Sequence, residues 1–347
     1  GSNSAFGYRS LFSNTSGVNN SAFGLYSLRN NIIGGANAAF GYSALKNNTT
    51  SGNNAFGYKA LFANTTGGSN SAFGYRSLFS NTSGVNNSAF GLYTLRNNTT
   101  GGGNSAFGYG SLRSNTIGVS NSAFGYKALR YNTTGSQNTA VGDQSLYSNT
   151  TGASNIAVGF QSLYSNTTGS GNIAIGYNSG QTNETGSNNT YIGNGADCTD
   201  SSYNNSTAIG YLAQITKSDQ IVFGQISNGD VVAPSVYIPG IVGIGTDIPQ
   251  TNLDVVGGVH VTNNLDVGGI VTTGKDAMIH GLTIGRGGGS SNTNSVLGGS
   301  ALSNNTTGTY NSAIGFNALA TNTVGMFNSA FGYNAGLTNV TGNGNTF

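Results

Sequence analysis

Large apolar residues along this chain stand at fixed places in a repeating unit of 17 residues. Each unit contains an anchor Gly that directly follows a large apolar residue, which is Phe in the early units and Val or Ile in later ones. Ala nearly always stands two residues before the anchor, and Leu stands four residues after it in most units. A fixed period decides the architecture before local propensities do. The anchors are Gly7, Gly24, Gly41, Gly57, Gly74, Gly91, Gly108, Gly125, Gly142, Gly159, Gly176, Gly193 and Gly210, with one step of 16 at Gly57, and then Gly298, Gly315 and Gly332.

Asn occupies two further fixed positions in the unit. It stands four residues before nearly every anchor, as in Asn3, Asn20 and Asn37, and seven residues after most anchors. Asn tolerates left-handed backbone conformations, and identical Asn side chains stacked on one another can form a hydrogen-bonded ladder. The pattern therefore predicts two turns in each unit, with an Asn ladder at each turn.

The composition of the unit favours short strands over helices. Asn-Thr-Thr-Gly recurs along the chain, and Gly, Asn and β-branched residues are poor helix formers. We predict an all-β fold in which each unit is one coil of a parallel β-solenoid, or β-roll, with two short strands and two turns. Such a coil has little interior. We therefore expect one apolar row, either the residue before the anchor or the Leu after it, to lie inside and the other to lie against neighbouring chains.

The repeat frame is interrupted once. Residues 1–215 form a first β-roll repeat block, residues 216–290 break the frame, and residues 291–347 form a second block. All three Pro residues, Pro234, Pro239 and Pro249, lie in the break among alternating apolar residues. We predict that residues 216–290 form a β connector that re-registers the chains of an assembly.

The repeat also resembles known fibre proteins. The unit Asn-Ser-Ala-Phe-Gly-Tyr-x-Ser-Leu-x-Ser-Asn-Thr-Thr-Gly resembles the head repeats of trimeric autotransporter adhesins, and residues 138–152 and 155–169 resemble still more closely the arrays of phage tail fibres and related virion proteins. Residues 242–257 are similar to a segment found ahead of the C-terminal chaperone of tail fibres, and residues 279–289 to one that introduces a new repeat block. The resemblance implies an intertwined, parallel homotrimer.

The composition of the chain fits an ordered repeat protein. Its 347 residues include 57 Gly, 3 Pro, 1 Cys and no Trp. Gly without a three-residue period excludes collagen, and the 10% of aromatic residues argues against a disordered chain. Cys198 alone allows no intrachain disulfide. No apolar run approaches the roughly 18 residues of a membrane helix, so we predict no membrane span.

Charge is distributed unevenly, although the net charge is only +2. Residues 1–142 hold nine basic residues and no acid, whereas residues 143–347 hold three basic residues and all ten acids. A basic ladder lined with Phe and Tyr would suit an anionic glycan, lipopolysaccharide or nucleic acid. Alternatively, these are solvated charges that oppose aggregation. The nine residues, each two or five after an anchor, are Arg9, Arg29, Lys46, Lys59, Arg76, Arg96, Arg113, Lys127 and Arg130.

Residues typical of catalysis or metal binding are sparse. His260 and His280 lie in the connector, where His260 alternates with Val and is more typical of a strand residue than of a base. The first 142 residues contain no acid, so they cannot supply the carboxylate pair of a glycosidase. Residues 197–200 (Asp-Cys-Thr-Asp) lack the spacing of a Ca²⁺ loop, and residues 285–289 lack the Gly-Lys-Ser/Thr of a phosphate loop. We therefore predict no enzyme activity, no cofactor and no metal.

Paired Thr residues in several units raise the possibility of an ice-binding surface. Consecutive residues of a strand point to opposite faces, so only one Thr of each pair can face outward. The row is also interrupted at residues 32–33 and 82–83. Ice binding is therefore the weaker hypothesis.

The sequence predicts a structural fibre protein. Our leading hypothesis is the shaft of a viral or phage tail fibre that attaches to a host surface, and the alternative is a bacterial cell-surface trimeric adhesin or a secreted filament subunit. The expected partners are further copies of the chain, in a homotrimer or an end-to-end filament, and a host-surface glycan or another anionic surface, without specific nucleic-acid recognition. The expected location is the virion, the extracellular space or the cell surface.

Overall fold

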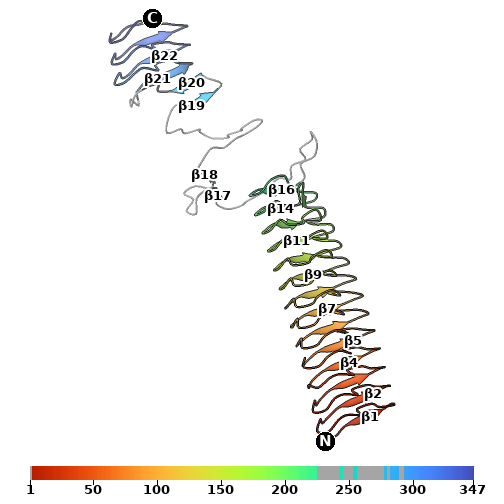
Figure 1. The fold of residues 1–347 in the computed structure, drawn as a ribbon. Helices are drawn as coiled ribbons and strands as arrows, with labels where there is room; N and C mark the ends of the chain where they lie inside the picture. The colour runs from red at the N-terminus through yellow and green to blue at the C-terminus, as the bar shows by residue number, and fades with distance from the viewer. Residues whose placement is uncertain (1, 225–241, 245–252, 256–276, 280–281, 289–292) are drawn as a thin grey trace. The chain divides into compact units, whose positions relative to one another are not determined.

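The computed structural model describes residues 2–224, 242–244, 253–255, 277–279, 282–288 and 293–347. The chain divides into two compact units, Gly1–Tyr237 and Ile238–Phe347. The first unit contains a 14-stranded parallel sheet whose strands follow one another in chain order (Figure 1). They are β1 (Ser4–Phe6), β2 (Ser21–Phe23), β3 (Ala38–Phe40), β4 (Asn54–Phe56), β5 (Ser71–Phe73), β6 (Ser88–Phe90), β7 (Ser105–Phe107), β8 (Ser122–Phe124), β9 (Thr139–Val141), β10 (Ile156–Val158), β11 (Ile173–Ile175), β12 (Thr190–Ile192), β14 (Thr207–Ile209) and β16 (Ile221–Phe223).

Successive coils stack in register, which confirms the predicted β-solenoid. Each strand residue lies opposite its counterpart one repeat later, as Ser4 does with Ser21. The step is 16 residues between β3 and β4, where Ala38 lies opposite Asn54, and 14 between β14 and β16. The coil that is one residue short keeps the register because its turn, and not its strand, is shorter by one residue. There, Asn48 donates to the carbonyl of Thr50, two residues on, whereas Asn64 donates to Gly67, three residues on.

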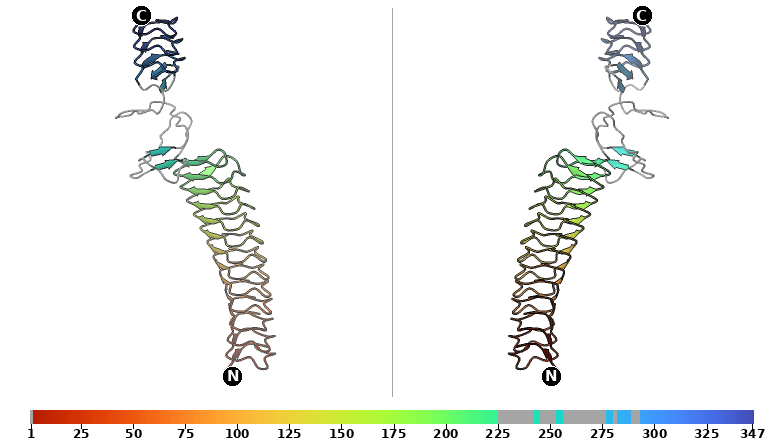
Figure 2. Two further views of the ribbon diagram at one scale, coloured as in Figure 1. Left: turned by 90° about the vertical axis from the view of Figure 1, so that its left-hand side faces the viewer. Right: turned by 90° about the vertical axis from the view of Figure 1, so that its right-hand side faces the viewer.

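Most coils contain one strand rather than the two that the sequence predicted. The anchor Gly and the residues two and four after it all have positive φ, as Gly74 (139°), Arg76 (53°) and Leu78 (47°) show. These angles are incompatible with an extended strand. The Leu side of the coil is therefore a run of turns, opposite the strands in Figure 2. Among the described residues of the first unit, a second strand appears only where the repeat changes, as β13 (Asp197–Cys198) pairs in parallel with β15 (Gln214–Ile215).

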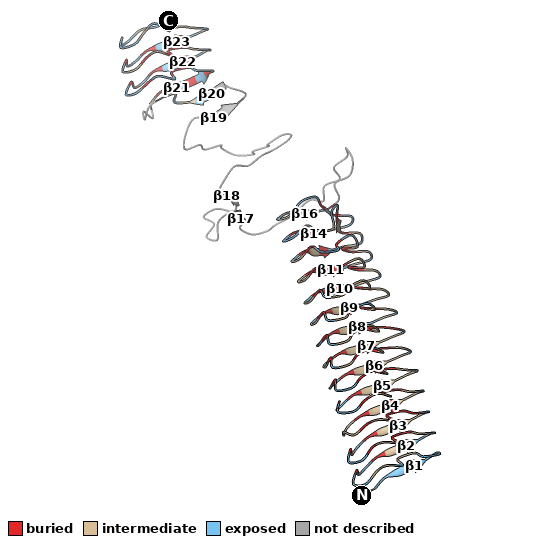
Figure 3. Ribbon diagram, in the orientation of Figure 1, coloured by how far each residue is buried: buried red, intermediate tan, exposed pale blue. Residues whose placement is uncertain are grey.

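The core of the first unit resolves which apolar row lies inside. Ala two before the anchor and Leu four after it are fully buried, as in Ala106 and Leu112. The Phe before the anchor points to the other face of its strand and is half-buried or exposed. Figure 3 shows this alternation, with β1 exposed and the following strands carrying a buried residue in the middle. The Leu row is therefore the interior row and the Phe row is the outer one.

The Asn residues form two buried ladders inside the turns, as predicted. Asn104 accepts hydrogen bonds through Oδ1 from the backbone N–H (3.0 Å) and Nδ2 (3.1 Å) of Asn121, one coil on. In the other ladder, the Nδ2 of Asn115 donates to Asn98 Oδ1 at 2.8 Å. Both ladders converge, because Asn104 (2.9 Å) and Asn115 (3.0 Å) donate to the same carbonyl, that of Gly118.

The expectation of left-handed backbone at the ladder Asn residues was wrong. None of the described Asn residues four before or seven after an anchor has positive φ. The left-handed positions are instead those two, four and twelve residues after the anchor, and the one four after it carries Leu in most coils. Asn is required in the ladders for its amide, which both donates and accepts, and not for its backbone freedom.

The row of interior Leu in the first unit ends at Leu163, and the next three coils carry Gly180, Asp197 and Gln214 at that position. Gly180 stands where other coils have Leu, and Tyr191, where the next coil would have Ala, is fully buried. A Cβ on Gly180 would lie 2.7 Å from Tyr191 Cδ2, so the ring occupies the space that Leu fills elsewhere. The second unit repeats this exchange, because a Cβ on Gly336 would meet Phe347.

The second unit resumes the roll. Strands β21 (Ser295–Gly298), β22 (Ser312–Ile314) and β23 (Ser329–Phe331) pair in parallel at 17-residue steps. They are preceded by an antiparallel pair, β19 (Ala277–Ile279) and β20 (Leu282–Gly285), and β20 pairs antiparallel with β21. Strands β17 (Val242–Ile244) and β18 (Leu253–Val255) form a separate parallel pair. Most of the predicted connector, with Pro234, Pro239, Pro249, His260 and His280, lies outside the described residues.

Substitution of one ladder Asn should destabilise the roll. In Asn104→Ala the buried N–H of Asn121 loses its acceptor and Gly118 loses one of two donors, which should lower the free energy of unfolding by about 2–4 kcal/mol. Urea denaturation measures this change. Asn97→Ala, at an exposed position in the neighbouring coil, should alter stability by less than about 0.5 kcal/mol. Equal stability of the two variants would contradict the role of the ladder.

The Gly180–Tyr191 exchange predicts a reciprocal rescue. Tyr191→Ala removes a buried ring and should cost about 3–5 kcal/mol. Gly180→Leu alone should also destabilise, because its side chain meets the ring. The double variant should recover most of the lost stability, since it recreates the Leu and Ala of other coils. The backbone can accept Leu, because Leu163 has a φ of 48° at this repeat position and Gly180 has one of 60°. Additive losses in the double variant, measured by urea denaturation, would exclude this packing.

Candidate interaction surfaces

The outer face of the long sheet carries a continuous row of apolar side chains. Seven Phe rings, from Phe23 in β2 to Phe124 in β8, stack with centroids 4.6–5.0 Å apart and planes within 10° of parallel. Beyond β8 the row continues with Val and Ile, and a second exposed position in the strands also becomes apolar, as in Ile156. We call these residues the sheet face. Exposed apolar surface of this extent is typical of an interaction site.

The nine basic residues are brought together on a different side of each coil, along the turns that follow the anchor. A column of Tyr runs between them from Tyr8 to Tyr126, with neighbouring centroids 5.0–6.3 Å apart. Where the residue after the anchor is Leu, as at Leu25, the next residue is Tyr, so the column is unbroken. We call the nine basic residues and this Tyr column the basic flank.

Each cation of the basic flank lies over an aromatic ring. Lys127 Nζ is 4.5 Å from the Tyr126 centroid, and Lys59 Nζ is 5.3 Å from Tyr58 and 5.4 Å from Phe62. Such contacts attract a cation without neutralising it. The other seven basic residues make equivalent contacts at 5.3–5.8 Å.

No carboxylate compensates these charges along the first 142 residues, which contain no acid. The Nε donors of Arg29, Arg76, Arg96 and Arg130 are buried and have no hydrogen-bond acceptor among the described residues. All nine basic residues except the exposed Arg9 are half-buried, because their stems lie across the rings. The rings hold the cations in place and leave their charge available to an external anion.

The candidate calcium ligands do not form a site. Asp197 accepts hydrogen bonds from Thr182 N (3.0 Å) and Oγ1 (2.8 Å), whereas Asp200 accepts from Ser202 N (2.9 Å) and Oγ (2.6 Å). Burial raises the pKa of Asp197, although the hydrogen bonds from Thr182 act to lower it. Burial also raises the pKa of the Cys198 thiol to about 12, so the thiol stays protonated at neutral pH. The described residues include no group of three His, Cys, Asp or Glu side chains that could hold a metal.

The first Thr of the repeated pairs is engaged within the roll. Thr65 Oγ1 donates to the Thr82 carbonyl at 3.0 Å, and Thr133 Oγ1 donates to the Thr150 carbonyl at 3.0 Å. The hydroxyls therefore support the stacking of coils. Only the second member of each pair remains for an outward row, as the sequence suggested, so the ice-binding hypothesis receives no further support.

Comparison with known protein families and curated proteins identifies no relative of this chain. No protein-family model matches the chain, and no curated protein matches it. Within the described ranges, no helix has both the length and the apolar character that crossing a bilayer requires. The resemblance to fibre proteins therefore rests on the repeat motif and on the two segments at residues 242–257 and 279–289.

The basic flank predicts salt-sensitive binding to a sulfated glycan. Immobilised heparin should retain the protein, and affinity should fall roughly tenfold or more between about 50 and 200 mM salt, because several charges are screened together. A triple variant, Arg76→Gln with Arg96→Gln and Arg113→Gln, should bind more weakly, whereas Lys217→Gln, which lies outside the flank, should not. Surface plasmon resonance measures both effects. Affinity that is the same at both salt concentrations, or in the triple variant, would contradict an electrostatic site.

Proposed function

We propose that this protein is the shaft of a homotrimeric fibre, of the phage or viral tail-fibre type, that attaches to a host surface. The observation that carries the proposal is the sheet face. An apolar row that continues through all 14 strands of the long sheet is stable in water when other chains cover it. The solenoid supplies a regular, stacked scaffold, as a shaft requires.

The repeat favours a parallel arrangement of identical chains. Because the apolar row recurs in every coil, identical chains that run in parallel around a rotation axis can cover it at every level with matched coils. The resemblance to trimeric adhesin and tail-fibre repeats favours three chains over two. The same resemblance supports the second candidate, a bacterial cell-surface adhesin or secreted filament subunit, in which the roll has the same mechanical role.

Contact with a host surface is supported by the basic flank. It lies on the turns after the anchor and not on the sheet face, so association of chains through the sheet face leaves it available. Nine cations in each chain, repeated by symmetry, would give the shaft a strongly positive segment. We therefore propose an anionic glycan as the surface component that this segment meets.

Light scattering on a sizing column tests the assembly. A chain of 35.1 kDa should give a particle of about 105 kDa as a trimer. Replacing two Phe of the sheet face, Phe73→Ser with Phe90→Ser, should shift the particle towards the monomer mass, because polar side chains weaken the apolar contact.

The matched control replaces two Phe outside the sheet face. Phe62 and Phe79 stack on each other at 5.3 Å beside the basic flank, and Phe62→Ser with Phe79→Ser should leave the trimer intact. Circular dichroism should show that both double variants keep the roll. A wild-type chain that remains a monomer at micromolar concentration would refute the trimeric shaft.

A further inference from the structure

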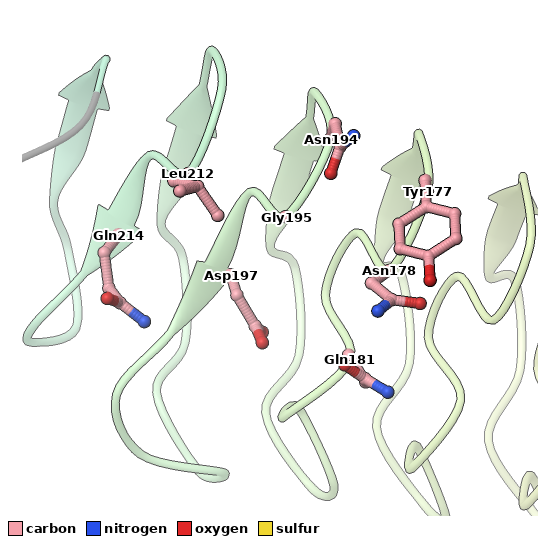
Figure 4. A pocket seen from close by; sticks show the side chains of 8 residues that line it. All are labelled: Tyr177, Asn178, Gln181, Asn194, Gly195, Asp197, Leu212 and Gln214. Carbon is pink, nitrogen blue, oxygen red and sulfur yellow. The ribbon is translucent and has the colours of Figure 1, made fainter.

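A polar cavity of about 420 Å³ opens on the turns of three successive coils near the end of the first unit. Its lining comes from one coil through Tyr177, Asn178 and Gln181, from the next through Asn194, Gly195 and Asp197, and from the third through Leu212 and Gln214. Figure 4 shows these side chains around a common hollow, with Asp197 directed towards Gln181. The cavity lies at the repeat positions that carry the basic flank in earlier coils.

The hollow exists because the repeat changes here. In most earlier coils the ring after the anchor is covered by a ring of the next coil. Phe160 stacks on Tyr177 at 5.2 Å, but the next coil has Asn194 at this position, so no further ring covers Tyr177. Tyr177 is 53% exposed. Gly195, which has no side chain, stands where most earlier coils carry Arg, Lys, Tyr or Gln, although Gly110 occupies the same position in one of them. One face of the Tyr177 ring is therefore open towards the cavity.

The remaining lining is rich in neutral hydrogen-bonding groups. Four of the eight lining residues carry carboxamides, and these groups both donate and accept. Asn178 Oδ1 is buried and has no donor among the described residues, although buried polar atoms normally have one. The Asp197 carboxylate is fixed by three contacts with Thr182 and supplies an acceptor at the wall.

Charge limits what the cavity can accept. No Lys or Arg occurs between Arg130 and Lys217, and the lining includes Asp197, so an anion would meet repulsion without a compensating cation. The lining also has only one carboxylate, which is too few for a metal site. A neutral ligand with many hydroxyl groups and one apolar ring face fits both the carboxamides and Tyr177.

We propose that this cavity binds one residue of a neutral saccharide. The sugar ring stacks on Tyr177, and its hydroxyl groups bond to Asn178, Gln181 and Asp197. The site rests on the proposed function in one respect, because a fibre that attaches to a host surface needs a receptor. The first unit thus carries two separate glycan sites, one for anionic chains and one for a neutral sugar.

Saturation-transfer difference NMR with the full chain tests this site. Glucose, galactose, mannose and N-acetylglucosamine are each titrated to about 50 mM, with glucuronate as the charged comparison. At least one neutral sugar should bind with a Kd in the millimolar range, as expected for so small a ligand. Its affinity should be unchanged between about 50 and 500 mM NaCl, and glucuronate should bind more weakly.

Two variants and one matched control locate the binding. Tyr177→Ala and Asn178→Leu should each weaken binding tenfold or more. Leu is tolerated at the second position, because Leu212 occupies the same repeat position with φ of 51°, against 52° for Asn178. Tyr211→Ala removes a Tyr from the corresponding position two coils later, outside the cavity, and should bind like the wild type.

The outcomes separate this site from the fibre proposal. Absence of binding by all four neutral sugars, or full binding in both variants, would overturn the saccharide site. Light scattering on the same samples reports the assembly independently. A trimer that binds no sugar refutes the cavity alone, and a monomer that binds sugar refutes the fibre alone.

Discussion

The buried Asn ladders are the interaction on which the rest of the structure depends. The apolar interior of a 17-residue coil is small, with one row of Leu and otherwise mostly Ala, and its turns direct backbone groups inward, where water cannot reach them. A buried backbone group without a partner is costly. Asn has the reach and the paired donor and acceptor to satisfy one coil's carbonyl and the next coil's N–H at once. Stacking and turn geometry are thus specified by the same side chain.

Because the interior is fixed in this way, the outward positions are free to carry different chemistry. Because side chains alternate along a strand, the residue before the anchor points to the sheet face. The residues after the anchor lie in the turns and form the basic flank. The two surfaces can therefore vary independently along one chain. Residues 1–31 and 68–98 are identical except that Ser27 is replaced by Thr94. This exchange illustrates the constraint on interior positions, since both hydroxyls donate to the anchor carbonyl, at 3.0 and 2.9 Å.

The period, the Asn ladders and the two positions of the basic residues could all be predicted from the sequence, because each repeats too often to be local coincidence. The left-handed backbone conformation of the interior Leu residues could not be predicted, because Leu rarely adopts it and only the stacking of coils imposes it. The Tyr191 exchange and the neutral cavity were also missed. Each depends on residues from different coils that depart from the regular repeat, such as Gly180 with Tyr191, and the repeat pattern does not predict how such departures pack together.

Those departures are where the roll differs most from a uniform rod. A perfect repeat presents the same surface at every level and can bind only a ligand that is itself repetitive, such as a charged polymer along the basic flank. A discrete ligand requires a break in the pattern, which Asn194 and Gly195 provide because they replace the aromatic ring and the longer side chain of most earlier coils. The interior changes at the same level, where the Tyr191 ring fills the space beside Gly180. The internal packing exchange and the external cavity therefore occur in the same stretch of coils, where the sequence departs from the regular repeat.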